Sequence, residues 1–182
     1  MKIAAYCAYL AAWLVFAIAA VVGALPLLRR HATATTAITA PVLIGTVFQA
    51  LAALAITRSM ASGPLHPGTF ELAGALLLAP FGAALFVWAL QSAPSDANEN
   101  TLVTGGAYSW LRHPIYLAFL LMLVATGLLI SAGIKLILPA LLYLGGSELR
   151  IATEEDELAK RFPEDFAQYR GRTRWRYLPG LR

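Results

Sequence analysis

The chain has 182 residues, of which 59% are hydrophobic and 13% are charged, and its mean hydropathy is +0.66. A soluble domain of this size cannot hide several apolar runs of roughly twenty residues, so the composition indicates one integral-membrane domain over residues 1–182. The net charge of +4 does not indicate a nucleic-acid partner, because the cations lie beside apolar runs and do not form a basic face with stacking aromatics.

Three apolar runs fill the first half of the chain. They extend from Ile3 to Leu28, from about Ala37 to Ile56 and from Phe70 to Leu90, and each is long enough to cross a bilayer as a helix. The second run contains the strongly polar Gln49, which we expect to face another helix rather than lipid. Residues 1–90 are therefore predicted to form three N-terminal spans.

Two further runs follow a polar loop over Gln91–Thr101. The segments Pro114–Ile130 and about Ile134–Leu149 are separated by three residues, so they predict an antiparallel helical hairpin. The fifth run is short for a lipid-exposed span, and we expect its hairpin partner to shield it. An amphipathic helix is predicted to continue to Phe162, and Pro163 can open a further short helix.

The cations decide the orientation of these five spans. With the N-terminus outside, three of the fourteen Lys and Arg residues lie outside, namely Lys2, Arg58 and Lys135. The other eleven, among them Arg29 and Arg30, then lie in the cytoplasm. The predicted fold is an all-α integral membrane protein with about five transmembrane helices, a C-terminal helical hairpin and a cytoplasmic helical tail.

The most polar membrane-edge segment of the chain is 102–116. One turn contains glycine, tyrosine, arginine and histidine side chains, at Gly106, Tyr108, Arg112, His113 and Tyr116. Ionisable groups at membrane depth are costly and usually face a cavity, so this cluster predicts a binding site. Tyrosine faces suit an aromatic base or a cation, and glycine lets the backbone approach a ligand closely. A plain turn with an interfacial histidine is the alternative.

A second polar set follows the fifth run. The acidic residues from Glu154 to Glu157 would ordinarily form a solvated helix face. The predicted hairpin, however, returns them to the same side of the membrane as residues 102–116. One carboxylate can then pair with a ligand's ammonium group. Arg150 lies four residues before Glu154, a spacing that allows it to tether that carboxylate.

These segments together resemble a known enzyme family. Gly106-Ala107-Tyr108 and Arg112–Tyr116 are followed by Glu154-Glu155 and then by Arg176-Tyr177-Leu178-Pro179. In this order and spacing they resemble the isoprenylcysteine carboxyl methyltransferase and phospholipid methyltransferase superfamily. The resemblance covers residues 102–179, while the first three spans match only as hydrophobic helices. Family members often have Pro where Ala107 stands.

The resemblance implies a membrane methyltransferase that uses S-adenosyl-L-methionine. Residues 102–179 would form the cofactor site through the motif, the hairpin and the tail, and a lipophilic acceptor would enter from the bilayer. The implied cofactor-binding residues are Gly106, Tyr108, Arg112, His113, Tyr116, Glu154 and Glu155, and the implied catalytic residues are Arg176 and Glu154. For Arg176, which would orient the acceptor, anchoring of lipid headgroups is the alternative.

The predicted function is carboxyl methylation of an isoprenylcysteine-like compound on the cytoplasmic side. The alternatives are N-methylation of a phospholipid amine, a nicotinamide-dependent enzyme like the sterol reductases, or a non-catalytic membrane scaffold. Sterol reductases carry basic residues where Glu154 and Glu155 stand here. The expected partners are a lipophilic small-molecule or lipid substrate and membrane lipids. No His, Cys and carboxylate set has metal-ligand spacing, so we expect no metal site.

Overall fold

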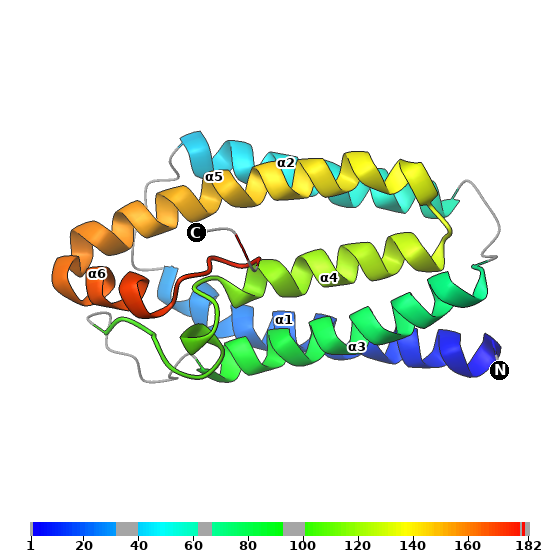
Figure 1. The fold of residues 1–182 in the computed structure, drawn as a ribbon, viewed down its shortest axis with the longest axis horizontal. Helices are drawn as coiled ribbons and strands as arrows, with labels where there is room; N and C mark the ends of the chain where they lie inside the picture. The colour runs from blue at the N-terminus through cyan, green and yellow to red at the C-terminus, as the bar shows by residue number, and fades with distance from the viewer. Residues whose placement is uncertain (1, 32–39, 62–66, 93–100, 179, 181–182) are drawn as a thin grey trace.

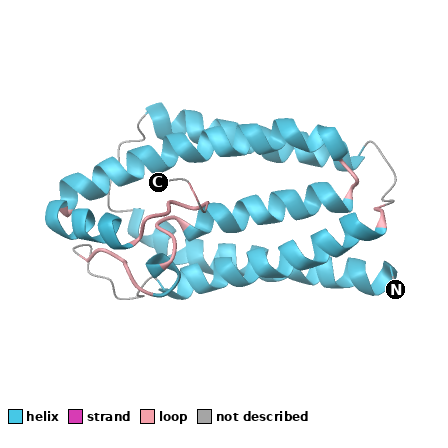
Figure 2. Ribbon diagram, in the orientation of Figure 1, coloured by secondary structure: helices cyan, strands magenta, loops and turns pink. Residues whose placement is uncertain are grey.

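The structure is a computed structural model that describes residues 2–31, 40–61, 67–92, 101–178 and 180; for 2–5, 23–31 and 60–61 it describes the backbone alone. These residues form helices and no strand, which confirms the all-α prediction (Figure 2). The longer helices are α1 (Lys2–His31), α2 (Ala40–Ala61), α3 (Thr69–Ser92), α4 (Pro114–Leu129), α5 (Ile137–Arg161) and α6 (Pro163–Arg172). Two 3-10 turns are η1 (Gly106–Ser109) and η2 (Gly133–Leu136). The predicted cytoplasmic cations Arg29 and Arg30, and most of the predicted polar loop, lie outside the described side chains.

The helix boundaries follow the local sequence. Proline occupies the first turn of α4 and of α6. The amides of a first turn have no partner within the helix, so the missing amide hydrogen of proline costs no intrahelical bond there. The amide of Phe162 bonds to the carbonyl of Leu158 at the end of α5, and α6 begins at the next residue. The predicted break at Pro163 is therefore confirmed.

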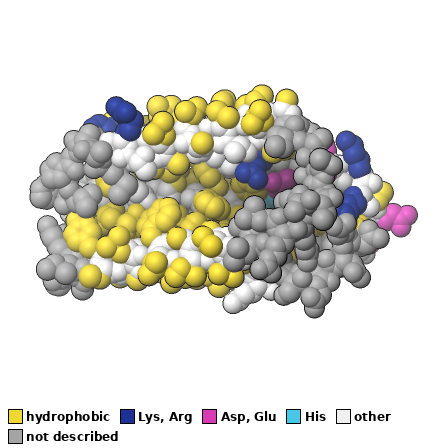
Figure 3. Space-filling model, turned by 180° about the vertical axis from the view of Figure 1, so that it is seen from behind, with side chains coloured by type: hydrophobic (Ala, Val, Ile, Leu, Met, Phe, Trp, Pro, Cys, Tyr) yellow, Lys and Arg dark blue, Asp and Glu magenta, His cyan; other side chains and the backbone are white. Residues whose placement is uncertain are grey.

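The structure contains helices of membrane-spanning length. By length and composition, Ala40–Ser59, Thr69–Ser92 and Gly133–Arg161 can each cross a bilayer among the described residues. Tyr6–Val22 and Pro114–Leu129 are shorter apolar helices. Large apolar side chains such as those of Leu14 on α1 and Leu77 on α3 are exposed, and Figure 3 shows apolar side chains along the outer faces of the helices. These features identify an integral membrane protein.

The long helices lie roughly parallel, and α6, η1 and the C-terminal segment gather at one end of the bundle (Figure 1). Helix α3 packs along α1 and α4. An aromatic cluster fastens these helices, because the Phe16 ring stacks on Phe86 at 4.3 Å and meets the edge of Phe119 at 4.8 Å. This core holds α4, and with it the start of the 102–116 motif, against the N-terminal half.

Helix α2 packs along α5 through two glycines. A Cβ on Gly45 would overlap the carbonyl oxygen of Gly146, and a Cβ on Gly146 would overlap that of Gly45. Gln49, one turn along α2, donates to the Ser147 hydroxyl at 3.1 Å and accepts from Arg150 Nη1 at 3.1 Å. The prediction that Gln49 faces another helix is confirmed.

The expected shielding of the fifth run by the fourth is wrong. The chain reverses at Ser131–Gly133 as predicted, but α5 packs mainly on α2 and α4 packs mainly on α3. The physical reason is that the glycine crossing lets α2 approach α5 to backbone contact, whereas α4 is held by the α1–α3 core. Tyr143 of α5 still donates to the Tyr116 carbonyl at 2.8 Å. The separation of α4 from α5 leaves room for a cavity.

Candidate functional site

A cavity of about 910 Å³ lies among α1, α2, α4 and α5. This volume is at the upper end of the range for small-molecule and cofactor pockets. Figure 3 shows a hollow in this face of the molecule, with cationic, acidic and histidine side chains visible at one end of the hollow. The cavity therefore combines a polar end with a long apolar part.

Two compartments can be defined from the lining residues. The polar compartment lies near the motif, α5 and α6, and its lining includes Tyr108, Arg112, His113, Glu154, Phe162 and Tyr169. The apolar compartment lies between α1, α2 and α4, and its lining includes Tyr9, Trp13, Ala52, Ile56, Phe119 and Thr126. Tyr116 and Arg150 line the cavity where the two compartments meet.

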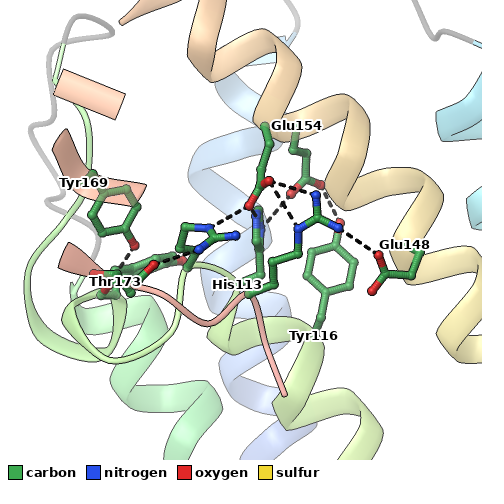
Figure 4. Close-up of polar contacts among 10 residues, drawn as sticks. His113, Tyr116, Glu148, Glu154, Tyr169 and Thr173 are labelled. Atoms are coloured by element: carbon green, nitrogen blue, oxygen red, sulfur yellow. Dashed lines mark hydrogen bonds and ion pairs between the residues drawn. The ribbon is translucent and has the colours of Figure 1, made fainter. Parts of the chain in front are cut away.

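The centre of the polar compartment is His113, which lies between two carboxylates (Figure 4). Its Nδ1 is 3.4 Å from Glu154 Oε2, and its Nε2 is 3.4 Å from Glu155 Oε1. The residue is only 7% exposed, and its buried Nε2 has no partner with hydrogen-bond geometry. Because a buried polar atom ordinarily has a partner, this nitrogen is available to a ligand.

The electrostatics favour a protonated His113. Burial by itself lowers the pKa of the imidazole, but the two nearby carboxylates of Glu154 and Glu155 outweigh burial and raise the pKa above 6.5. The nearby hydroxyl of Tyr108 stays protonated, because burial and then the charge of Glu154 raise its pKa above 10.0. The ligand-free site thus places an imidazole, whose charged form is favoured, between two carboxylates.

Tyr116 and Arg150 fix the carboxylate of Glu154. The Tyr116 hydroxyl donates a short hydrogen bond to Glu154 Oε1, and Arg150 Nη2 lies 3.8 Å from the same oxygen. The Arg150 guanidinium carbon is also 5.6 Å from the centroid of the Tyr116 ring. The predicted tether from Arg150 is confirmed, and Arg150 Nε is a second buried nitrogen without a hydrogen-bond partner.

Arg112 is a buried clamp between the motif, α5 and the C-terminal segment. Its Nε donates to Glu155 Oε1 at 2.7 Å, and its Nη1 donates to the carbonyl of Thr173 at 2.7 Å. The backbone amides of Arg112 and His113 donate to the carbonyls of Trp175 and Arg176, at 3.0 and 2.7 Å. The C-terminal segment is therefore bound alongside the motif, as Figure 4 shows for Thr173.

Two of the predicted site residues, Glu155 and Arg176, form an ion pair beside the cavity. Arg176 Nη2 is 3.1 Å from Glu155 Oε2, and Arg176 Nη1 is 3.0 Å from Glu148 Oε2. Neither Glu155 nor Arg176 is among the described residues that line the cavity. Their assigned contacts with cofactor and acceptor stay predictions, while the geometry gives both a role in holding the tail to α5.

Gly106 lies outside the described cavity lining and has a conformational role. Its φ is +59°, and a Cβ there would overlap the Ser92 hydroxyl oxygen. That oxygen accepts the amide of Ala107 at 3.0 Å and donates to the carbonyl of Trp88 at 2.7 Å. Glycine thus lets η1 close onto the end of α3, and its predicted contact with cofactor stays untested.

Of the predicted site residues, the structure brings Tyr108, Arg112, His113, Tyr116 and Glu154 to one cavity. Sequence reasoning missed the polar link from Gln49 to Arg150, although a single glutamine in an apolar run is a readable signal. It also missed Glu148 and Thr173, which carry no motif. The described residues contain no group of three His, Cys, Asp or Glu that could hold a metal ion.

Comparison with known proteins bears directly on this site. A sequence model of the isoprenylcysteine carboxyl methyltransferase (ICMT) family matches residues 72–160. Over these residues, just under half of its length, the chain is similar to the ICMT family. The match includes the motif of 102–116 and the Glu154-Glu155 pair, so the resemblance seen in the sequence is confirmed. Members of this family are methyltransferases.

Three curated proteins share local similarity with this chain. Protein-S-isoprenylcysteine O-methyltransferase of Schizosaccharomyces pombe is 33% identical over 72 residues, which are 40% of this chain and 30% of the relative. The protein of the same name from Xenopus laevis is 31% identical over 104 residues, covering 52% and 36% of the two chains. The cobalt-zinc-cadmium resistance protein CzcN of Cupriavidus metallidurans is 39% identical over 79 residues, covering 43% and 36%. The chain spans about a third of the length of the curated relatives it matches.

Proposed function

We propose that this chain uses S-adenosyl-L-methionine to methylate the carboxylate of an isoprenylcysteine-like acceptor. The observation that carries the proposal is the cavity itself, which joins a polar compartment around His113 and Glu154 to an apolar compartment between α1, α2 and α4. The family match and the names of two relatives support the reaction class.

The residues of the polar compartment fit S-adenosylmethionine. Glu154 offers a carboxylate to the amino-acid ammonium or to the sulfonium, and His113 offers a buried nitrogen without a hydrogen-bond partner. The rings of Tyr108, Tyr116 and Tyr169 offer aromatic faces to a base or a cation. When bound, this cofactor supplies a methyl group whose bond to sulfur breaks as an acceptor oxygen bonds to the carbon, and the electron pair stays on sulfur.

The protein's own contribution is positioning and exclusion of water. A carboxylate acceptor already carries the lone pair that forms the new bond, so no side chain has to remove a proton. Glu154 is held by Tyr116 and Arg150 and cannot rotate freely. The apolar compartment would hold the acceptor's chain away from water.

We assign the acceptor carboxylate to Arg150, although the sequence motif pointed to Arg176. Arg150 lines the cavity where the compartments meet, and its buried Nε has no hydrogen-bond partner. Arg176 already pairs with Glu148 and Glu155. A guanidinium at this place attracts a carboxylate and repels an ammonium, which favours carboxyl methylation over methylation of a phospholipid amine.

We further propose that α1 to α5 all cross the membrane and that the site faces the cytoplasm. The motif, α6 and the C-terminal segment lie at the same end of the bundle (Figure 1). Most of the described cations belong to these segments and to the end of α5. Arg58 and Lys135 belong to the other side. Cysteines placed at Ser131 and at Arg172, on a Cys7-free background, should be labelled from opposite sides of the membrane.

The function is tested with purified protein and labelled S-adenosylmethionine. An N-acetyl-S-prenylcysteine should accept the methyl group, and the labelled product should be a methyl ester that mild base hydrolyses. His113→Ala and Glu154→Gln should each weaken S-adenosylhomocysteine binding about ten- to a hundredfold, the cost of one charge-assisted hydrogen bond. Glu157→Gln, an exposed change on the same helix, is the control. Unchanged binding in both site variants contradicts the cofactor assignment.

The acceptor assignment is tested by kinetics. Arg150→Gln should raise the KM for the prenylcysteine more than it weakens S-adenosylhomocysteine binding, and Arg176→Lys should leave that KM near the wild-type value. If Arg176→Lys lowers turnover with cofactor binding intact while Arg150→Gln does not change the KM, the acceptor contact belongs to Arg176. Arg174→Lys, at an exposed position two residues earlier, serves as control.

A further inference from the structure

A chain of hydrogen bonds between α1 and α4 lies at the far end of the apolar lining, because Tyr9 is the first lining residue of α1 and Thr126 is the last lining residue of α4. Trp13 Nε1 donates to the Tyr9 hydroxyl at 2.7 Å, and the Tyr9 and Thr126 hydroxyl oxygens are 2.7 Å apart. Thr126 donates its proton to the carbonyl of Met122 at 2.7 Å. Because that proton is committed, Tyr9 must be the donor to Thr126, and every donor in the chain is used.

This triad of Tyr9, Trp13 and Thr126 faces the cavity. All three residues line it, and Tyr9 and Thr126 are each 4% exposed. Because the hydroxyl and indole hydrogens of the triad are all donated within the chain of bonds, none is left to bond to a polar headgroup. The hydrogen bonds fix the phenol and the indole in place, so the rings resist displacement by a ligand. A fixed wall at the end of an apolar compartment limits the length of what enters.

The depth of the compartment follows from helix geometry. Tyr116, where the two compartments meet, and Thr126 are ten residues apart on α4. At 1.5 Å per residue this is roughly 15 Å, about half of the ~30 Å hydrocarbon thickness of a bilayer. The compartment thus has the depth of one lipid leaflet.

We propose that the Tyr9–Trp13–Thr126 triad is a stop that sets the longest apolar chain an acceptor can carry. This inference rests on the proposed function, since it assigns the apolar compartment to the acceptor's chain. The triad acts on chain length, while Arg150 acts on the headgroup. An acceptor one isoprene unit too long cannot place its carboxylate at Arg150 without displacing a ring.

The test uses N-acetyl-S-prenylcysteines with one, two, three and four isoprene units. Binding is measured as the rise of the protein's thermal midpoint, and methyl transfer is measured separately as kcat/KM. For wild type, the rise in thermal midpoint and kcat/KM should both increase with each isoprene unit up to an optimum. One unit beyond the optimum, kcat/KM should fall about tenfold or more and the rise in thermal midpoint should become smaller. Trp13→Ala should move the optimum to a longer chain.

Matched variants separate the stop from general stability. Leu14→Ala changes the next residue of α1, which is 62% exposed and outside the described lining, and should keep the wild-type optimum. Thr126→Val keeps the side-chain shape but breaks the link to Tyr9, and should reduce the discrimination against longer chains without moving the response to short ones. This variant decides the question if Trp13→Ala does not fold.

The outcomes are distinct for the two proposals. A response without an optimum, or the same optimum in wild type and both triad variants, overturns the stop. Absence of stabilisation by every chain also overturns it. If stabilisation shows an optimum that the triad variants alter, but no acceptor is methylated, the stop stands and the proposed reaction is wrong.

Discussion

Replacing Arg112 by methionine should release the C-terminal segment from the motif. The substitution removes two buried charge-assisted hydrogen bonds, one to Glu155 and one to the carbonyl of Thr173. Each is worth about 1.5–3 kcal/mol, so the two together are worth about 3–6 kcal/mol, similar to the cost of about 3–5 kcal/mol for breaking a buried ion pair. Glu155 keeps its contact with Arg176, so the loss should be concentrated at Thr173.

Tryptic cleavage after Arg174 measures this release. Arg174 is exposed, but the carbonyls of the next two residues are bonded to the motif, so cleavage requires local opening. Loss of the hydrogen bond to Thr173 alone should raise the fraction of molecules whose C-terminal segment is detached from the motif about ten- to a hundredfold. The cleavage rate should rise by the same factor. The thermal midpoint in detergent should fall by roughly 10 °C.

Two variants bound the interpretation. Arg112→Lys keeps the charge but cannot form both directed bonds, so its cleavage rate should lie between wild type and Arg112→Met. Arg170→Met removes an exposed arginine that lies over the Phe166 ring and should leave cleavage after Arg174 unchanged. Equal cleavage rates and equal midpoints in wild type and Arg112→Met would refute the clamp.

Three further outcomes are expected. Because the folded pKa of His113 is raised above 6.5, its stabilisation is fully present below pH 6.5 and is lost as the pH rises through the folded value; the midpoint of the ligand-free protein should fall over that range more for wild type than for His113→Gln. Gly146→Ala should cost about 1–3 kcal/mol in thermal unfolding through overpacking against α2, whereas Gly145→Ala, whose Cβ would meet Phe48 at an ordinary 3.7 Å, should be nearly neutral. Gly106→Ala should cost about 1–3 kcal/mol because of its φ of +59°, while Gly105→Ala, whose Cβ would meet nothing within 4 Å, should not; equal midpoints within either glycine pair would contradict the packing argument.

The helices were predictable because their signals are local. Apolar runs, proline at the first turn of a helix and the acidic face after residue 149 each depend on neighbours in sequence, so the observed ends of α3 and α4 differ from the predicted ones by at most two residues. The meeting of His113 with Glu154 was also predictable, because a short reversal between two runs returns the chain to its starting side.

The pairing of helices was not predictable from one sequence. The preference of α5 for α2 depends on Gly45 and Gly146 lying opposite each other, and neither glycine indicates its partner. The motif assigned Arg176 to the acceptor and Glu155 to the cofactor, and one sequence could not show that these two side chains pair with each other. Charged side chains of opposite sign can form ion pairs with each other, and only the geometry shows which charged groups are left to contact a ligand.

The backbone pairing of Arg112 and His113 with residues 175–176 has a consequence for biosynthesis. Ribosomes deliver the chain from its N-terminus, so the motif leaves the ribosome before residues 175–176 do. The polar compartment can therefore close only after the segment that follows α6 has also been released. A chain truncated after α6 would keep the helices but would lose the carbonyl partners of the Arg112 and His113 amides.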